Sequence, residues 1–340
     1  MRSTAKRWAE EGPLIELARL PALALLAAVS LALAPGAVAQ TSAELAEQDL
    51  RLARIADAML LANAGLCRQT MPVTGMILHS ADQYGEEALP LFANGPLSVA
   101  GVVPGSAAQL AGVQAGDGVV AINDRPIDAI SPEGEDNLRE AAFFLLADLP
   151  PGEPIILELR RGDGQETVQI EPERGCRSLV EILLADGPNA RSDGRVIQLQ
   201  FEFARDLADE QVAVVLAHEF AHTVLEHRRR KVEAGIDNAS LLRHVGRNQR
   251  VNREAEIEAD RLSVHLLANA GYDPALIAEF WRSPEGQQAG GGALPSFIYP
   301  TQSARAELVE TEIDRYLSLR RGPSWPGHLI ELRERDFASD

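Results

Sequence analysis

Positive charge, cysteine and long apolar runs are all scarce in this sequence. Its 340 residues include 32 Lys and Arg against 50 Asp and Glu, which gives a formal net charge of −18 at pH 7. A chain this acidic is not expected to take nucleic acid or an anionic membrane surface as its main partner, because both would repel it. The apolar content of 46 % is nevertheless enough to give each of two domains a core.

The one long apolar run, residues 22–34, lies near the N-terminus and follows several basic residues. It is shorter than the roughly 20 residues that a membrane-spanning helix needs. The small residues at 37–39 are typical of a signal-peptide cleavage site. We therefore predict that residues 1–39 are a signal peptide and that the mature chain is periplasmic or secreted, without a transmembrane span. An uncleaved N-terminal membrane anchor is the alternative.

The sequence contains only two cysteines, Cys67 and Cys176. In an oxidising compartment they can pair, and they bracket a block whose residue pattern differs from the rest of the chain. The bridge would close a loop of 109 residues (176 − 67). In the chain-entropy model, a bridge over so long a loop stabilises the fold by roughly 4 to 5 kcal/mol. Two buried thiols are the alternative.

Histidine is also scarce, with seven in the chain, yet two lie four residues apart in VAVVLAHEFAHTVLEH, residues 212–227. In a helix, His218 and His222 project from one face, one turn apart, and can bind a single zinc ion. Glu219 then lies beside the ion, where a carboxylate can take a proton from water that the ion activates. Accidental spacing on a buried helix is the alternative interpretation.

The ends of this segment support a helix. Asp206 can cap its N-terminus, and the basic residues 228–231 suit the negative end of the helix dipole. The apolar residues between the ends lie nearly all round the helix, which predicts that it is buried inside a domain. Two histidines and a glutamate in such a place need compensation, and a metal ion supplies it.

The third ligand is expected from a second helix, residues 251–271, which offers Glu254, Glu256 and Glu258. Glu254 and Glu258 belong to a polar stripe that continues to position 265, which we interpret as solvated surface. Glu256 and Asp260 instead head an otherwise apolar stripe. We therefore predict Glu256 as the third ligand and Asp260 as the hydrogen-bond partner of a ligating histidine. Glu254 and Glu258 remain alternatives.

At this point the sequence resembles the zinc metallopeptidases of the HtpX and CAAX-prenyl-protease type, with their soluble periplasmic relatives. The matching residues are the NA..DG of Asn189 to Gly194, the alternating strand-like segment Arg195–Phe203, and the motifs VVLAHEFAH, EIEAD and NAGYDP. They cover roughly residues 176–312. The resemblance implies one Zn²⁺ ion per chain, bound by His218, His222 and Glu256, with Glu219 as the catalytic base.

One position departs from the pattern of that family. Its soluble members often carry His-Pro ahead of an arginine, whereas this chain has Tyr299 and Pro300 ahead of Arg305. The resemblance implies that Tyr299 takes the place of the histidine. A phenol there could line the cleft or stabilise an oxyanion, next to Arg305.

Between the cysteines, the sequence has short strands and glycine turns. Strands are expected over residues 98–103, 119–123, 154–160 and 166–170, with a helix over 136–149. The run VVPGSAAQLAGVQAGDGVVAIND resembles the PDZ domains attached to bacterial proteases, over residues 86–173. Such domains bind a peptide C-terminus or an extended peptide by adding it to a sheet edge. A purely structural domain is the alternative.

These patterns predict an α+β chain: a mostly helical zincin-type metallopeptidase domain with a small sheet, plus an inserted β-rich PDZ-like domain. We expect a signal peptide (1–39), a helical segment packed on the protease domain (40–85), the PDZ-like domain (86–173), the metallopeptidase domain (174–320) and a tail (321–340). An amphipathic helix is expected over residues 42–64.

The function that follows is an exported zinc-dependent endopeptidase that cleaves polypeptide substrates. The family resemblance suggests misfolded or envelope proteins as those substrates. The alternative is a PDZ-bearing periplasmic chaperone or adaptor whose zinc site is latent or structural. An intact Glu219 and an open fourth coordination position favour the enzyme, because structural zinc sites are normally closed by four protein ligands.

Overall fold

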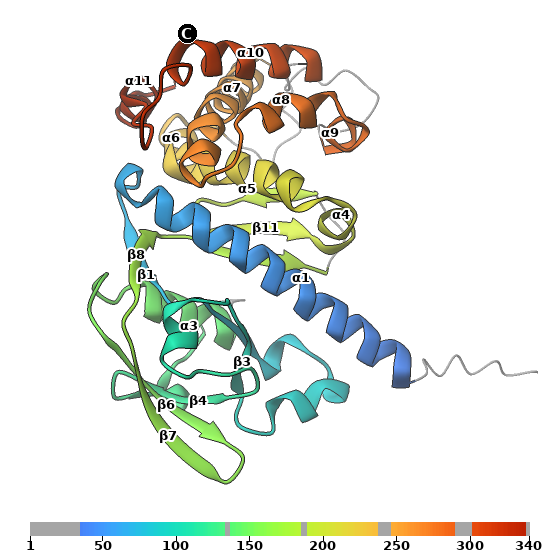
Figure 1. The fold of residues 1–340 in the computed structure, drawn as a ribbon, viewed down its shortest axis with the longest axis vertical. Coiled ribbons are helices and arrows are strands. Elements are labelled where there is room, and N and C mark those ends of the chain that lie inside the picture. Colours follow the sequence, from blue (N-terminus) through green and yellow to red (C-terminus); the bar gives the residue numbers. More distant parts are fainter. Residues whose placement is uncertain (1–34, 133–136, 185–188, 237–245, 290–300, 338–340) are drawn as a thin grey trace, which may run out of the picture.

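The computed structural model describes residues 35–132, 137–184, 189–236, 246–289 and 301–337. Within them the chain forms two large hydrophobic cores, one in a helical domain and one in a β-rich inserted domain, and a small third cluster around Phe337. Figure 1 shows the helical domain at the top, the inserted domain at the bottom and the long helix α1 (Pro35–Ala62) running diagonally past both. The N-terminal segment expected to be a signal peptide lies almost entirely outside the described residues.

The inserted domain is built on a six-stranded sheet. Its main strands, in the order β2-β3-β4-β6-β7, are Met76–Ser80, Leu97–Val102, Gly118–Ile122, Ile155–Arg161 and Gly164–Ile170, and β5 (Arg125–Pro126) pairs with β4. Neighbouring strands are antiparallel. The helices α2 (Ala107–Leu110) and α3 (Leu138–Ala147) accompany the sheet. The predicted strands and helix of this block are all present, with boundaries within a few residues.

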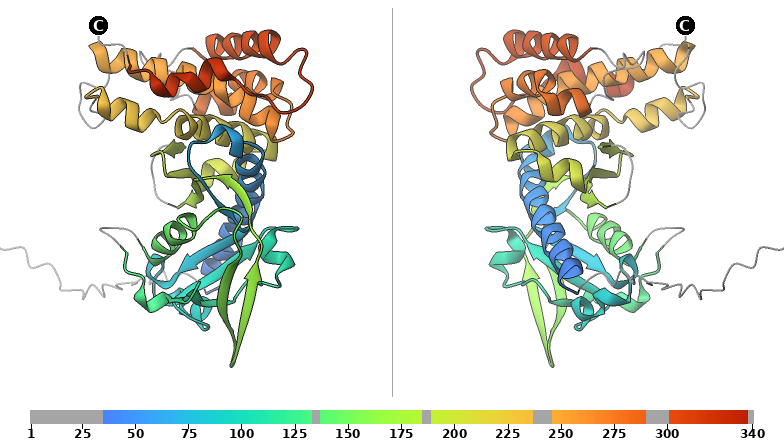
Figure 2. Two further views of the ribbon diagram at one scale, coloured as in Figure 1. Left: turned by 90° about the vertical axis from the view of Figure 1, so that its left-hand side faces the viewer. Right: turned by 90° about the vertical axis from the view of Figure 1, so that its right-hand side faces the viewer.

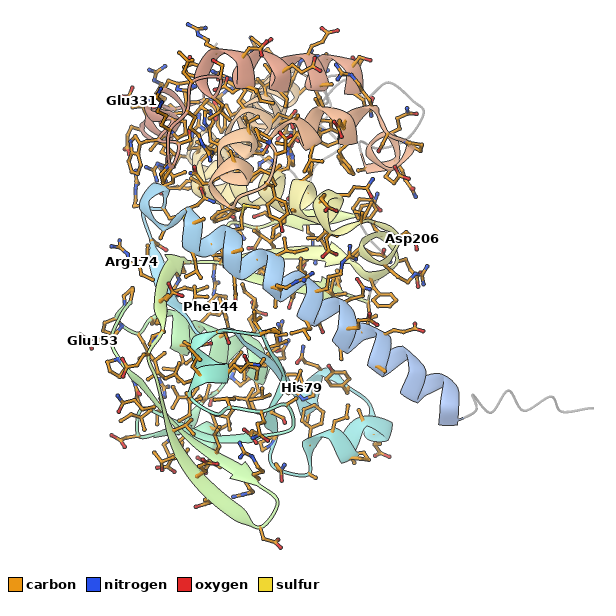
Figure 3. All side chains as sticks on the ribbon, in the orientation of Figure 1. His79, Phe144, Glu153, Arg174, Asp206 and Glu331 are labelled. Atoms are coloured by element: carbon orange, nitrogen blue, oxygen red, sulfur yellow. A yellow bond between two sulfur atoms is a disulfide. The ribbon has the colours of Figure 1, made fainter. Side chains whose placement is uncertain are left out.

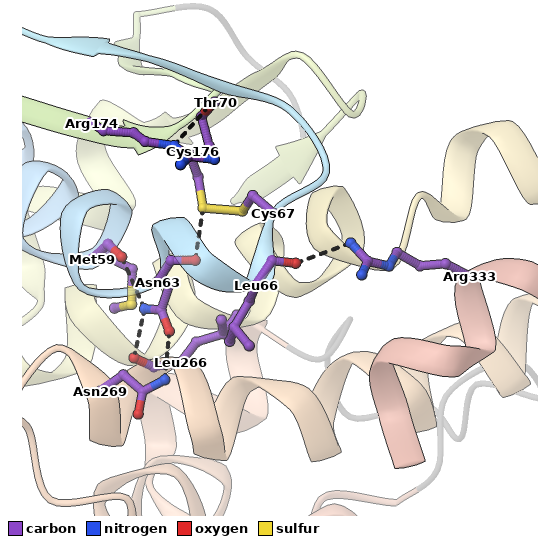
Figure 4. Close-up of a disulfide and its surroundings, with 10 residues drawn as sticks. All are labelled: Met59, Asn63, Leu66, Cys67, Thr70, Arg174, Cys176, Leu266, Asn269 and Arg333. Atoms are coloured by element: carbon purple, nitrogen blue, oxygen red, sulfur yellow. Dashed lines mark hydrogen bonds between the residues drawn. A yellow bond between two sulfur atoms is a disulfide. The ribbon is translucent and has the colours of Figure 1, made fainter. Parts of the chain in front are cut away.

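Two short strands join the inserted domain to the rest of the chain. β1 (Thr70–Val73) enters it and β8 (Glu173–Cys176) leaves it, and the two pair antiparallel with Thr70 opposite Cys176. The Cys67–Cys176 disulfide lies at the base of this pair, so the predicted bridge is confirmed (Figure 4). The disulfide and the strand pair together fix where the chain leaves and re-enters the helical domain.

The helical domain contains a small sheet and a group of helices (Figure 2). The sheet has the order β10-β11-β9, with β9 (Leu179–Leu183) parallel to β11 (Val196–Gln200) and β10 (Ala190–Ser192) antiparallel to it. The helices are α4 (Phe201–Asp206), α5 (Asp209–Val224), α6 (His227–Glu233), α7 (Gly246–Asn269), α8 (Ala275–Arg282), α9 (Pro284–Ala289), α10 (Gln302–Tyr316) and α11 (Gly327–Ile330).

Helix α5 is the buried centre of this domain, as its apolar surroundings predict. Ten of its sixteen residues are buried, including Leu216, Phe220 and Val224. Its expected N-cap was wrong: α5 begins after Ala208, whose amide donates to the side chain of Gln211 at 2.9 Å. The same helix was expected to continue without a break to the basic residues 228–231. It breaks instead at Glu226, which has a φ of +53° and separates α5 from α6.

Helix α1 holds α5 and α7 in place. Arg51 of α1 donates from Nε to Oδ1 of Asp209 at 2.6 Å, at the start of α5. At the other end of α1, the buried Asn63 donates from Nδ2 to the carbonyl of Leu266 at 3.1 Å, and Asn269 of α7 donates to its Oδ1 at 3.0 Å (Figure 4). α1 thus fixes both helices that carry the predicted metal ligands.

Two further expectations need correction. The alternating strand predicted over residues 195–203 ends at Gln200, and Phe201 begins α4, because the Gln200 side chain caps that helix by accepting from the Phe203 amide. The C-terminal segment, in which the sequence offered no pattern, is packed: Leu329 and Phe337 are each no more than 1 % exposed. In the described part of the chain, none of the helices is both long enough and apolar enough to cross a membrane.

Candidate metal centre

Three side chains from α5 and α7 converge in the helical domain. The Nε2 atom of His218 lies 3.2 Å from Oε2 of Glu256 and 3.3 Å from Nε2 of His222. His222 Nε2 lies 3.6 Å from Oε1 of Glu256. All three candidate ligand atoms fall within 4.8 Å of one another. Two imidazole nitrogens and one carboxylate oxygen form a donor set that suits zinc and leaves one position of a tetrahedron open.

The outer nitrogen of His218 is held by a buried ion pair. Its Nδ1 lies 3.1 Å from Oδ1 of Asp260, which is fully buried. Arg305 of α10 donates two hydrogen bonds, of 2.7 and 2.6 Å, to the carboxylate of Asp260. The guanidinium of Arg305 also lies 3.4 Å from the ring centroid of Trp281. With Nδ1–H of His218 donating to Asp260, Nε2 is the nitrogen left to face the site.

The outer nitrogen of His222, Nδ1, is held by a series of hydrogen bonds that the sequence did not reveal. Nδ1 of His222 lies 2.7 Å from Nδ1 of His227, and Nε2 of His227 lies 2.9 Å from Oε2 of Glu258. The same oxygen accepts from Arg230 at 2.5 Å, so Glu258 is an ionised acceptor. His227 then donates from Nε2 and accepts at Nδ1. His222 must donate from Nδ1, which leaves the lone pair of its Nε2 facing the other two ligands.

The charges of the site follow from its burial. Burial by itself would lower the pKa of His218, but its hydrogen bonds to Asp260 and Glu256 outweigh this and raise the pKa to about 9. Burial also lowers the pKa of His222 and His227 well below the ordinary value, so both are neutral at pH 7. For Glu256, burial by itself would raise the pKa, but the interactions with His222, His218 and Arg305 outweigh burial and lower the pKa. A cation held by this carboxylate is therefore electrostatically favoured.

Glu219 follows His218 on α5 and adjoins this group. Burial raises its pKa to about 7, against an ordinary value near 4.5. A carboxyl with a pKa close to neutral can both take and return a proton at physiological pH, which is what general acid–base chemistry requires. Glu219 therefore supplies a proton acceptor that is distinct from the three candidate ligands.

The structure brings together five of the predicted site residues: His218, Glu219, His222, Glu256 and Asp260. Arg305 joins them through Asp260 and through a contact of 3.3 Å between its Nη2 and Nδ1 of His218. Tyr299 lies outside the described residues. Glu258 was interpreted as solvated surface, and this was wrong: it is 5 % exposed and ion-paired with Arg230. His227 was missed as well, although an HxxxH…H series along the same segment was the signal that could have drawn attention to it.

A second histidine cluster lies at the far side of α7. His265, 1 % exposed, contacts Oγ of Ser324 at 2.6 Å through Nδ1 and Oε1 of Glu312 at 3.1 Å through Nε2. The same Glu312 oxygen lies 2.7 Å from Nε2 of His328, and its other oxygen accepts from Arg261 at 2.8 Å. His265 and Glu258 of the polar stripe are therefore buried, whereas Glu254 is exposed as expected. The cluster superficially resembles a Ser-His-Glu triad, but its acid is shared among three partners.

Comparison with known proteins identifies the inserted domain. The family model of the PDZ domain matches residues 98–161, so the expectation of a PDZ domain is confirmed. No match to a curated protein was found. The chain as a whole is thus an α+β protein that contains a PDZ domain.

Several solved structures are similar to part of the chain. A serine endoprotease from Yersinia pestis is 20 % identical with a TM-score of 0.22, and the match covers 32 % of this chain and 30 % of that one. The HtrA-type protease AlgW with a decapeptide is 20 % identical, with a TM-score of 0.24 and coverage of 31 % and 30 %. The HtrA3 PDZ domain bound to a phage-derived ligand is 26 % identical, with a TM-score of 0.23 and coverage of 31 % and 89 %. The match thus spans about a third of the two complete proteases.

These findings contradict the predicted family. The matching family model is that of a PDZ domain, and the similar structures include HtrA-type proteases rather than HtpX-type zinc metallopeptidases. The assignment to the HtpX and CAAX-prenyl-protease type was therefore wrong, because short motifs are compatible with more than one family. The function that rested on it is withdrawn with it, both the exported zinc endopeptidase for misfolded or envelope proteins and the chaperone alternative.

The match to the PDZ domain does not include the residues around His218. The matched PDZ segment ends at residue 161, and the three converging ligands lie beyond it. TM-scores this low carry no information on the rest of the chain. Zinc binding therefore stays a prediction that depends on the geometry of the centre alone.

Proposed function

We propose that this chain couples a peptide-binding PDZ domain to a separate centre that binds a single zinc ion, and the hydrolysis assay of Glu219→Gln tests whether that centre is also catalytic. His218, His222 and Glu256 would hold the ion. The disulfide fits an oxidising compartment, which supports an exported protein.

One observation carries the proposal: the Nδ1 atom of each histidine is held by an outer hydrogen-bond partner, so that both Nε2 atoms face Glu256. The Asp260–Arg305 pair does this for His218, and the His227–Glu258 chain does it for His222. The two Nε2 atoms lie only 3.3 Å apart, and the pKa of about 9 for His218 means that a proton occupies this position where no cation does. Ligating histidines characteristically have such outer hydrogen bonds.

Zinc in such a site polarises a carbonyl group and lowers the pKa of water. The residues of the chain supply the remaining chemistry. Glu219 accepts a proton from the attacking water and returns it to the leaving group, and a pKa of about 7 suits both steps. Asp260 and Arg305 act as positioning residues, because they reach the site only through His218.

The first test is the substitution Glu219→Gln in the purified chain. An amide cannot act as a base, so hydrolysis of an unstructured polypeptide should fall by about 10²–10⁴-fold, whereas zinc content should stay at one per chain. Glu210→Gln is the matched control, because Glu210 lies on the same helix and is exposed. Undiminished hydrolysis by Glu219→Gln would remove the metal centre from consideration as the catalyst.

The same hydrolysis assay tests whether Ser324, His265 and Glu312 form a catalytic triad. Ser324→Ala removes the hydroxyl that contacts His265 and should leave hydrolysis within about twofold, because Glu312 is already committed to Arg261 and His328. A loss confined to Ser324→Ala, with full activity in a chelator, would instead indicate a serine-type centre at His265.

A further inference from the structure

A cavity of about 490 Å³ lies between the inserted domain and the helical domain. Its walls come from α1, β2, α3 and β9, and His79 of β2, labelled in Figure 3, is among its lining residues. This volume falls within the range of roughly 300–1,000 Å³ typical of ligand pockets. None of the three candidate metal ligands lines the cavity, so it is separate from the metal centre.

Two sheet edges border this cavity. Within the described residues, β2 is the outermost strand of the inserted sheet and β9 is the outermost strand of the small sheet. Asp49 of α1 accepts a hydrogen bond from the amide of Ile182 in β9, which caps that edge. β2 is thus the edge better suited to accept an added strand, as in the peptide complexes of other PDZ domains.

The cavity walls alternate between apolar and acidic side chains. Met76 and Leu78 of β2, Phe143 of α3 and Val180 of β9 supply apolar surface. The ionisable lining residues are the acids Asp49, Asp57, Glu140 and Glu181, the base Arg139, and His79. Arg139 is ion-paired with Glu181. Burial lowers the pKa of His79 to about 4, so the histidine is neutral at pH 7. Acids thus outnumber bases in the cavity, and burial raises the pKa of Asp49 to about 7.

Asp57 is the acid without a countercharge. Among the described residues, no hydrogen-bond or ion-pair partner of its carboxyl is found, and burial raises its pKa to about 7. Its Oδ2 lies 3.5 Å from the position that a Cβ atom would occupy on Gly75, directly before the start of β2. A ligand cation placed there would relieve the cost of burying this carboxylate.

We propose that the cavity binds an internal, extended polypeptide segment carrying a lysine or arginine, which adds as a strand to β2 and places its cation beside Asp57. The proposal rests on the peptide-binding part of the proposed function and not on the metal centre. It differs from capture of a peptide C-terminus. A strand added antiparallel to β2 has its C-terminal end beside Gly75, where a free carboxylate would face the carboxylate of Asp57.

The test measures binding rather than cleavage. The full chain carrying Glu219→Gln is titrated with fluorescent heptapeptides of alternating valine and threonine, acetylated and amidated at their ends, with one lysine moved along the sequence. The best peptide should lose about tenfold in affinity when its lysine is replaced by norleucine. Methylation of a backbone nitrogen should also weaken it, because strand addition uses main-chain hydrogen bonds.

Asp57→Asn should abolish the preference for lysine over norleucine, while Glu47→Gln, an exposed acid on the same helix, should preserve it. Three results would overturn the proposal: no binding by any peptide of the set, equal affinity for lysine and norleucine peptides in the chain with Asp57 intact, or tighter binding of the free-acid form than of the amide. Hydrolysis is assayed separately with the unsubstituted chain, so failure of the cavity and failure of the metal centre are distinguishable.

Discussion

At the residue scale, the sequence identifies the candidate ligands but not the residues that orient them. The spacing of His218 and His222 on one helix is a local property, so it can be predicted. The chain from His222 through His227 to Glu258 cannot, because His227 and Glu258 are 31 residues apart and their bond exists only after α6 packs on α7. Periodicity alone could not separate a buried ion pair from a solvated stripe.

The hydrogen-bond chain leads to a prediction for His227→Phe. The substitution removes the acceptor for Nδ1–H of His222 and leaves all three candidate ligands intact. The imidazole of His222 can then rotate or change tautomer, so zinc affinity should fall by about 10–100-fold, as for other outer hydrogen-bond partners of metal ligands. Competition with a chelating dye measures this loss.

Glu254→Gln is the control for this experiment, because Glu254 lies on α7 near Glu256 but is exposed. It should bind zinc as the unsubstituted chain does. Equal zinc affinity in His227→Phe and Glu254→Gln would mean that the hydrogen bonds from His222 through His227 to Glu258 stabilise the fold and do not affect zinc binding.

At the element scale, local sequence patterns predicted the ends of helices and strands correctly where the turn contains glycine. They failed where the turn contains no glycine. A glycine turn was expected between the strands at 154–160 and 166–170, and Gly162, with a φ of +60°, lies in the turn between β6 and β7. The break between α5 and α6 was missed because Glu226, a non-glycine residue, adopts the left-handed conformation. Helix α1 was expected as an amphipathic helix, but its contacts with two domains depend on tertiary packing that periodicity cannot show.

One element-scale prediction concerns Asp57, on the face of α1 that lines the cavity. Its pKa is raised from 3.8 to about 7 in the folded chain, so the folded state binds this proton more tightly than the unfolded state does. The associated stability is fully present below pH 3.8 and is lost as the pH rises through 7. Asp57→Asn cannot titrate and should therefore be more stable than the unsubstituted chain at pH 8, by on the order of 2 kcal/mol, and nearly equal to it at pH 4.

Urea denaturation at both pH values measures this difference. The other ionisable residues of the cavity, among them Asp49, Glu140, Glu181, Arg139 and His79, are the same in both proteins, so only the difference between the two proteins reports on Asp57. The same stability gain at pH 4 and pH 8 would show that Asp57 is solvated enough to keep its ordinary pKa.

At the scale of the whole molecule, two cysteines and a change of pattern were enough to predict an inserted domain closed by a disulfide. The cavity between the domains could not be predicted from the sequence, because its walls include residues of α1, β2, α3 and β9, which are far apart in the sequence. No local pattern records how such segments meet. The family assignment failed for a related reason, since motifs of a few residues were used to identify a whole chain.

The last prediction concerns the independence of the two candidate sites. β1 and β8 pair as far as Val73 opposite Glu173, so an Asn-Gly turn joining these two residues would convert the strand pair into a hairpin and remove the inserted domain while keeping Cys67 and Cys176. The shortened chain should bind one zinc and hydrolyse a short peptide within about threefold of the full chain, because its ligands come from α5 and α7. It should lose the lysine-peptide binding and the advantage on large substrates that tethering provides. Zinc analysis, peptide titration and hydrolysis of a short and a long substrate test this together. Loss of zinc in a chain that still unfolds cooperatively would show that the inserted domain is part of the metal centre rather than a separate peptide-binding module.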